Sequence, residues 1–275
     1  LPKLFVFAPA GQGKYQFLPN PITGDTFSIG HDYALLVVIG NDTLVSFSTL
    51  NPTTTIDSLS LVDVEGNGPP INTTGKYVEL MAKDRKGPGD FYWIKTFRND
   101  SFLNNISQLN ISADMGNTSR GQDGELFIYP VRYNGVNDFS RSFKTGETVR
   151  IEIHSINAVA FAWFNLVVSE NQNGGLFATP PANIFTNIVS FNPNKKTGVG
   201  GFFCVSAVTE ASHGQGCVGC GLYRSHQDAD GFTWNVGLLQ SRSHAGRQAF
   251  FGCGWAVGFG GGRQAQTDAG QSLPH

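Results

Sequence analysis

Short runs in which apolar and polar residues alternate recur along the chain and predict strands. In Thr148–His154 three β-branched residues alternate with arginine, glutamate and histidine, a period of two that buries one face of a strand. Phe91–Phe97 has apolar residues on both faces, which is typical of a central strand. Tyr33–Ile39 is a continuous apolar run expected of a buried strand, with Leu44–Ser48 as its hairpin partner. Further candidate strands are Ile56–Val64, Tyr77–Ala82, Leu126–Tyr133 and Phe202–Val208, whereas the polar segment Asn104–Gln122 is expected to be a surface loop.

One segment has the pattern of a helix. Asn157–Glu170 is apolar nearly all round, and either Ser155 or Asn157 supplies an N-cap side chain at its start. Asn173-Gly174-Gly175 supplies a glycine that can take the left-handed conformation at its end. A helix without a polar face is normally covered on both sides, so Trp163 is expected among the most buried residues. The alternative is that part of this helix contacts a partner protein.

Composition narrows the class of protein. The chain has 275 residues, of which 40% are hydrophobic and only 15% charged, so it is globular and long enough for one large core or two modest ones. Many Asn, Thr, Ser and Gly residues separate the apolar runs, which favours strands joined by turns. A net charge of −2 without any Lys/Arg block excludes nucleic acid as an expected partner. No apolar run reaches 18 residues, so no transmembrane helix is expected.

The composition changes after Thr209. Residues 210–275 contain no lysine and no isoleucine, but 14 of the 34 glycines and three of the four cysteines. A glycine-rich segment is costly to order, so this tail is expected to be poorly structured. An appended module and translation in a shifted reading frame both remain open as explanations of the change.

Candidate chemistry is sparse. Cys217 and Cys220 have metal-ligand spacing, but no second half of a zinc site follows, so they are only weak candidates for a metal site. The sequence contains no nucleophile motif and no phosphate-binding glycine loop, and it predicts neither an enzyme nor a cofactor. Glu147, Glu152 and His154 are expected to be solvated on or beside the polar face of a strand.

Four consecutive blocks together resemble one known family. They are a strand in Gly146–Ile156, an aromatic-rich helix in Asn157–Asn173, a loop with the sequence Pro-Pro-Ala-Asn-Ile in Phe177–Ile188, and a closing strand in Gly200–Val208. The proline loop is the specific part. The chain is similar over about residues 13–208 to a family of Bacteroidetes outer-membrane lipoproteins defined by a domain of unknown function.

The resemblance implies an architecture and a location. The expected fold is all-β, an immunoglobulin-like β-sandwich with one buried helix near 157–170. Residues 1–54 would be the remnant of an immunoglobulin-like domain, 55–209 the main sandwich, and 210–275 a tail outside the family pattern. The expected location is the outer membrane or cell surface. Because neither a signal peptide nor a lipid-anchor cysteine occurs at the start, the chain is expected to be a fragment or processed form, with membrane contact only through the missing lipid anchor.

The resemblance also implies a role. It is that of a non-enzymatic surface lipoprotein that assists a TonB-dependent outer-membrane β-barrel transporter. The alternative is an independent secreted adhesive or glycan-binding sandwich, for which Tyr92 and Tyr133 are the candidate exposed platforms. The proline loop is the candidate contact, because Pro180 and Pro181 pre-set its backbone while Phe177, Ile184 and Phe185 supply apolar anchors. These apolar side chains would otherwise fold back and seal the end of the helix.

Overall fold

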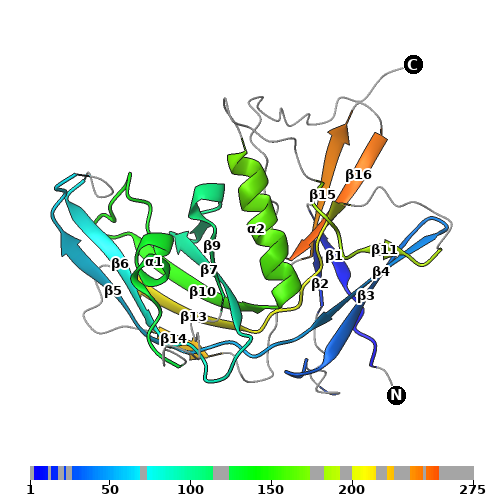
Figure 1. The fold of residues 1–275 in the computed structure, drawn as a ribbon, viewed down its shortest axis with the longest axis horizontal. Helices are drawn as coiled ribbons and strands as arrows, with labels where there is room; N and C mark the ends of the chain where they lie inside the picture. Colours follow the sequence, from blue (N-terminus) through cyan, green and yellow to red (C-terminus); the bar gives the residue numbers. More distant parts are fainter. Residues whose placement is uncertain are drawn as a thin grey trace.

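The computed structural model describes residues 3–11, 14–17, 22, 27–68, 73–113, 124–173, 183–192, 200–214, 222–225, 236–243 and 246–253. These residues form mainly antiparallel sheets with one long helix, which confirms the predicted all-β sandwich (Figure 1). The strands are β1 (Ala8–Gly11), β2 (Lys14–Gln16), β3 (Asp32–Ile39), β4 (Asp42–Thr49), β5 (Ile56–Val64), β6 (Gly75–Ala82), β7 (Phe91–Arg98), β8 (Ser101–Phe102), β9 (Asn110–Ala113), β10 (Thr148–Ile156), β11 (Val189–Ser190), β12 (Gly200–Gly201), β13 (Val208–Gly214), β14 (Leu222–Ser225), β15 (Val236–Ser243) and β16 (Gly246–Cys253). The helices are α1 (Tyr129–Arg132) and α2 (Ala158–Gln172), with 3-10 turns η1 (Ile106–Gln108) and η3 (Asn134–Val136).

The largest sheet has the strand order β14-β13-β10-β7-β8, and β9 also pairs with β7. All these pairings are antiparallel, and β7 is central, as its two apolar faces predict. Ile153 of β10 lies opposite Ile94 of β7 on one side and Thr209 of β13 on the other. This register places the alternating apolar residues of neighbouring strands on the same face of the sheet.

That apolar face forms the main core. The β5–β6 hairpin covers it together with α1 and η3, and α1 lies beside the hairpin in Figure 1. Asn137 fixes this cover, because its side-chain amide accepts from the Val78 N–H and donates to the carbonyls of Val78 and Tyr133, at 2.8 Å each. The core side chains are Ile56, Leu59, Val78, Leu80, Ala82, Tyr92, Ile94, Phe127, Val131, Val136, Phe143, Val149, Ile151, Ile153 and Ala211.

Helix α2 covers part of the opposite face. Asn157 is its N-cap, since the side-chain oxygen accepts from the Ala160 N–H at 2.8 Å. Phe164 is 2% exposed, and its ring centroid lies 4.7 Å from that of Trp93 in β7. The expectation of a helix buried on both sides is wrong, because Val159 remains 53% exposed. Trp163 is only half-buried, so Phe164 takes the position that was expected for Trp163.

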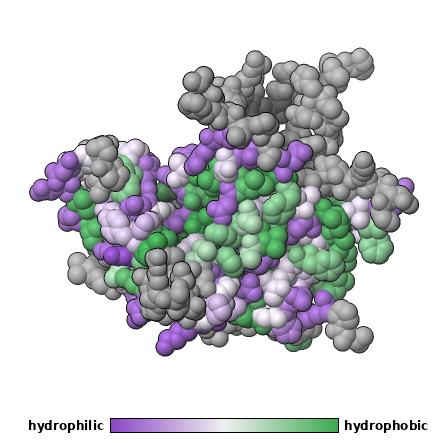
Figure 2. Space-filling view, viewed as in Figure 1, coloured by the Kyte–Doolittle hydropathy of each residue, from purple (hydrophilic) through white to green (hydrophobic). Residues whose placement is uncertain are grey.

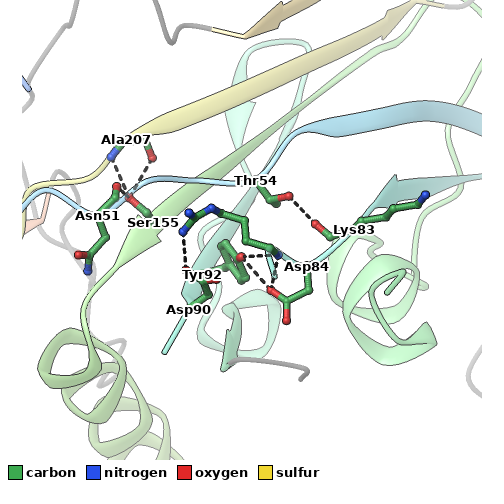
Figure 3. A network of polar contacts seen from close by, with 9 residues as sticks. Asn51, Thr54, Lys83, Asp84, Asp90, Tyr92, Ser155 and Ala207 are labelled. Atoms are coloured by element: carbon green, nitrogen blue, oxygen red, sulfur yellow. Dashed lines mark hydrogen bonds and ion pairs between the residues drawn. The ribbon is translucent and has the colours of Figure 1, made fainter. Parts of the chain in front are cut away.

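The N-terminal strands form a smaller sheet of order β11-β4-β3, which β11 completes from far along the sequence. The Asn51 carbonyl accepts from the Ser155 hydroxyl at 2.6 Å, and Asn51 forms a parallel bridge with Ser206 (Figure 3). The predicted segments 1–54 and 55–209 are therefore tied together by long-range strand pairing and hydrogen bonds.

Three local expectations differ from the structure. Leu126–Tyr133 is a helix from Tyr129 onward, because Pro130 suits the first turn of a helix and lacks the N–H a strand needs. The expected loop Asn104–Gln122 contains η1 and β9. Most of Phe202–Val208 is buried but not strand, and the strand runs over Val208–Gly214 instead.

The predicted boundary at residues 209 and 210 consequently lies inside β13, which pairs with β10 as far as Gly214. Further along, β14 pairs with β13, β15 pairs with β16, and β12 pairs with β16. The expectation of a poorly structured tail otherwise concerns residues outside the described ones. Among the described residues, no helix has the length and apolar character needed to cross a membrane.

Candidate functional site

The strongest candidate site is the outer face of the β11-β4-β3 sheet. The β3–β4 hairpin turns through Gly40-Asn41, and Gly40 has φ +60°, as a two-residue turn with glycine at its first central position requires. Along β4, Leu44, Ser46 and Ser48 are buried, so the residues between them face outward. The sequence prediction of the hairpin is confirmed, but the expectation that Tyr33–Ile39 is fully buried is wrong.

Strand β11 is held against β4 by the end of the proline loop. The Asn187 side chain donates to the Phe203 carbonyl at 2.7 Å and accepts from its N–H at 2.8 Å. The Ser46 hydroxyl donates to the Asn187 carbonyl at 2.8 Å, and Ile188 is fully buried. The Phe191 N–H then donates to the Thr43 carbonyl at 2.8 Å. The loop therefore ends as a rigid third strand.

The outer face of this sheet is apolar and open. Leu36 and Val45 are opposite each other in the β3–β4 ladder, and Val45 is opposite Val189 of β11, so these side chains lie on one face. Figure 2 shows apolar residues gathered on the β3–β4 side of the molecule. We call this surface the apolar sheet face and define it by Leu36 (59% exposed), Val38 (72%), Phe47 (68%), Val189 (51%) and Phe191 (75%).

Of the residues predicted as a partner contact, only Ile184 and Phe185 are described, and they precede β11 along the chain. Phe177, Pro180 and Pro181 are outside the described residues, as are the weak metal candidates Cys217 and Cys220. Ile184 is half-buried. Phe185 packs edge-on against Phe202 at 6.1 Å yet is 40% exposed. Within the described part of the chain, no cluster of three or more His, Cys, Asp or Glu residues could hold a metal ion.

Sequence reasoning missed the face itself. A signal was present, because Leu36 and Val38 lie in a continuous apolar run that reads as doubly covered. The three-stranded sheet covers only one side of that run, which the sequence does not reveal.

The two tyrosines proposed as exposed platforms are buried, so that expectation is wrong. Tyr92 is fully buried in the main core, and its hydroxyl donates to Asp84 at 2.8 Å (Figure 3). Burial and the Asp84 carboxylate both raise its pKa far above 10. Tyr133 is 4% exposed, and burial, with Tyr129 beside it, raises its pKa to about 12.

A second candidate is a group of charged residues on the α2 side of the central sheet. We call it the charged cluster: Lys95 of β7 with Arg150, Glu152 and His154 of β10. Glu152 accepts from the His154 Nε2 at 2.8 Å and pairs with Arg150. The Arg150 guanidinium lies 3.8 Å from the Phe97 ring centroid, and Lys95 Nζ lies 4.0 Å from that of Trp93.

The charged cluster is largely removed from water, contrary to expectation. Lys95 is 4% exposed, and the His154 side chain is 13% exposed. Burial and the positive charge of Lys95 lower the pKa of His154 to about 4 despite the Glu152 carboxylate, so the imidazole is neutral at pH 7. For Glu152, burial raises the pKa, but the His154 hydrogen bond and the cations of Lys95 and Arg150 outweigh it, so the net shift is downward.

The polar groups of the charged cluster pair with one another and with neighbouring strands. The neutral His154 donates to the ionised Glu152, and Arg150 also lies 3.8 Å from Glu210 of β13. No hydroxyl or thiol of the described residues hydrogen-bonds to His154, so the described chain offers it no nucleophile to activate. The arrangement therefore fits a structural polar cluster better than a catalytic dyad.

Glu147 also departs from the expectation of a solvated carboxylate. It is 9% exposed and accepts from the Lys144 N–H at 2.9 Å, and this hydrogen bond lowers its pKa. Arg141 at 2.5 Å and Arg98 at 3.9 Å lower the pKa further, against the effect of burial. The residue anchors the turn before β10.

Comparison with known proteins places the chain at the level of family. No curated protein and no solved structure matches the chain. The sequence profile of one family, described as a domain of unknown function (DUF4249), matches residues 6–212 and so extends from β1 into β13. The chain therefore belongs to the DUF4249 family.

Proposed function

We propose that this protein is a non-enzymatic lipoprotein of the outer-membrane surface that assists a TonB-dependent transporter, and that the apolar sheet face is its contact. The location and the transporter come from the family resemblance. The observation that carries the binding role is the exposure of five apolar side chains on one rigid face. Monomeric soluble proteins rarely leave a large contiguous apolar patch open unless it binds something.

The composition of the face suits a protein partner. Phe47 and Phe191 are 68% and 75% exposed, and exposed aromatic side chains on a strand are the usual anchors of a protein interface. Both are held by strand pairing, Phe47 within β4 and Phe191 directly after β11, so little conformational entropy is lost when they dock. The glycan-binding alternative has lost its two proposed platforms, since Tyr92 and Tyr133 are buried.

The test uses the full-length native protein extracted from outer membranes in mild detergent. It should co-elute with a TonB-dependent β-barrel, and Phe47→Glu or Phe191→Glu should abolish the co-elution because a carboxylate is costly to bury in an apolar contact. Val159→Glu is the matched control, because Val159 is 53% exposed but lies on α2 and not on this sheet.

Two results would count against the proposal. If the wild-type protein elutes alone and no barrel cross-links to it in cells, the accessory role fails and independent ligand binding becomes the better account. If the barrel binds but the two Phe variants and the control all retain it, the role stands and the apolar sheet face is not the contact.

A further inference from the structure

Strand β3 is an unprotected sheet edge. Among the described strands it is hydrogen-bonded only to β4, and their eight residue pairs run without a register shift. Natural proteins usually protect such an edge with proline, lysine, a bulge or very short length. The β5–β6 hairpin shows this protection, with a register irregularity next to Asp57 and with Lys76 in the partner strand. In β3, by contrast, Asp32 is the only charged residue and proline is absent.

The turn geometry identifies which backbone groups the edge presents. In a two-residue hairpin the closing pair, here Ile39 and Asp42, exchanges hydrogen bonds, and bonded pairs then alternate along the ladder. Counting back from Ile39, the N–H and C=O groups of Ala34, Leu36 and Val38 point away from β4. The same three residues point their side chains outward, since all three are exposed.

The base of this strand is held in place. Tyr33 packs against Phe27 with ring centroids 5.2 Å apart, and Phe27 stacks on Phe5 at 4.1 Å. The Tyr33 hydroxyl also accepts from the Ser28 N–H at 2.6 Å. The edge is therefore presented in a fixed, extended conformation, which lowers the cost of adding a strand to it.

We propose that β3 pairs with β3 of a second copy of this chain, antiparallel and centred on Leu36, so that two three-stranded sheets join into one of six strands. In this register Leu36 faces Leu36 of the partner subunit, and Ala34 faces Val38 in both directions. Asp32 falls opposite Gly40, so no two like charges meet. Centring on Ala34 instead would place Leu36 opposite Asp32, and centring on Val38 would place Ala34 opposite Asp42.

The edge therefore complements itself in charge and in backbone pattern. Each copy offers three successive outward residues, and a two-fold axis at the middle one satisfies all of them at once. Side chains at the seam are aliphatic and uncharged, as a tight antiparallel pair prefers. The pairing uses the backbone edge of the sheet and leaves Phe47 and Phe191 uncovered, while Leu36 and Val38 of the apolar sheet face lie at the seam.

The first test is the mass of the purified chain by sedimentation equilibrium up to about 100 µM, where a micromolar Kd populates the dimer. Wild type should be dimeric and Leu36→Pro monomeric, because proline removes an outward N–H while sparing the bonds to β4. Leu36→Ala keeps that N–H and should still dimerise, with unchanged circular dichroism as the check on folding. A monomeric wild type would overturn the proposal, as would a Leu36→Pro variant that folds and dimerises.

The second test fixes the register without relying on proline. Residues facing each other in a hydrogen-bonded antiparallel pair have Cα atoms about 5.5 Å apart, within disulfide range. The Leu36→Cys variant should therefore form a disulfide between its two subunits on mild oxidation, joined at position 36 of each chain and mapped by peptide mass spectrometry. Val38→Cys, on the same strand and more exposed than Leu36, should not, because its two copies would lie about four residues apart along the seam. Equal cross-linking at both positions would mean non-specific face contact and would refute this register.

Discussion

Acid should destabilise this protein through His154, at a pH where surface histidines have little effect. The folded protein holds the pKa of His154 at about 4, whereas an unfolded chain has the ordinary value of 6.5. At pH values between these two pKa values, His154 is protonated in the unfolded chain but neutral in the folded one, so the free energy of unfolding must fall as the pH falls. The pKa difference of about 2.5 units corresponds to about 3 kcal/mol in total, at about 1.4 kcal/mol per unit. Because the side chain is only 13% exposed, solvent screening reduces this little.

The assay is urea unfolding of wild type and His154→Gln at pH 7.5, 6 and 5. Glutamine keeps an N–H that can donate to Glu152 but does not titrate. Wild type should lose about 2 kcal/mol more than the variant between pH 7.5 and 5. The pKa of Glu152 is lower in the folded protein than its unfolded value of 4.5, so the stability it adds is lost only below about pH 4.5. Glu152 therefore contributes little to the change between pH 7.5 and 5. Parallel pH profiles for the two proteins would refute the argument.

Three further predictions concern α2, each measured by urea unfolding. Phe164→Ala should lower the free energy of unfolding by about 3–5 kcal/mol, because it removes the contact with the central sheet. Val159→Ala, at an exposed position, should lower it by under about 0.5 kcal/mol. Similar costs for the two variants would mean that the helix does not pack as described. Asn157→Ala should lower the free energy of unfolding by about 1 kcal/mol through loss of the N-cap, whereas Asn157→Ser should retain most of that stability. Equal losses for both variants would exclude capping as the cause. Trp163→Phe should lower the free energy of unfolding by less than about 1 kcal/mol. The reason is that the buried indole Nε1 has no hydrogen-bond partner among the described residues, so no hydrogen bond is lost. A larger cost would reveal a partner elsewhere in the chain.

Several strands of the sandwich could be read from the sequence because each carries its own signal. The predicted Ile56–Val64 coincides with β5, and Phe91–Phe97 falls one residue short of β7. Period-two alternation and flanking turn residues are local properties, and so is the N-cap at Asn157. The start of α1 also had a local signal, Pro130, which the run of apolar residues before it outweighed.

Burial could not be read in the same way, because it depends on what another segment covers. His154 and Glu152 occupy the polar face of an alternating strand, yet their surroundings in the folded chain remove them from water. Leu36 and Val38 show the opposite error, since an apolar run predicts cover that the described chain does not provide. For the candidate site, the sequence predicted the proline loop that leads into β11, but not the exposed strand face that β11 completes.

Contacts of β4 with segments far along the chain constrain how the chain folds. Ser46 meets Asn187, 141 residues away, and Ser48 accepts from the Val205 N–H, 157 residues away. During synthesis, β3 and β4 therefore leave the ribosome long before the segment that completes their sheet exists. Such high contact order slows folding and leaves apolar strands open to aggregation in the meantime. The N-terminal hairpin should be the part of the nascent chain that most needs a holding chaperone, and it should become protease-resistant only after Asn187 to Val205 have emerged.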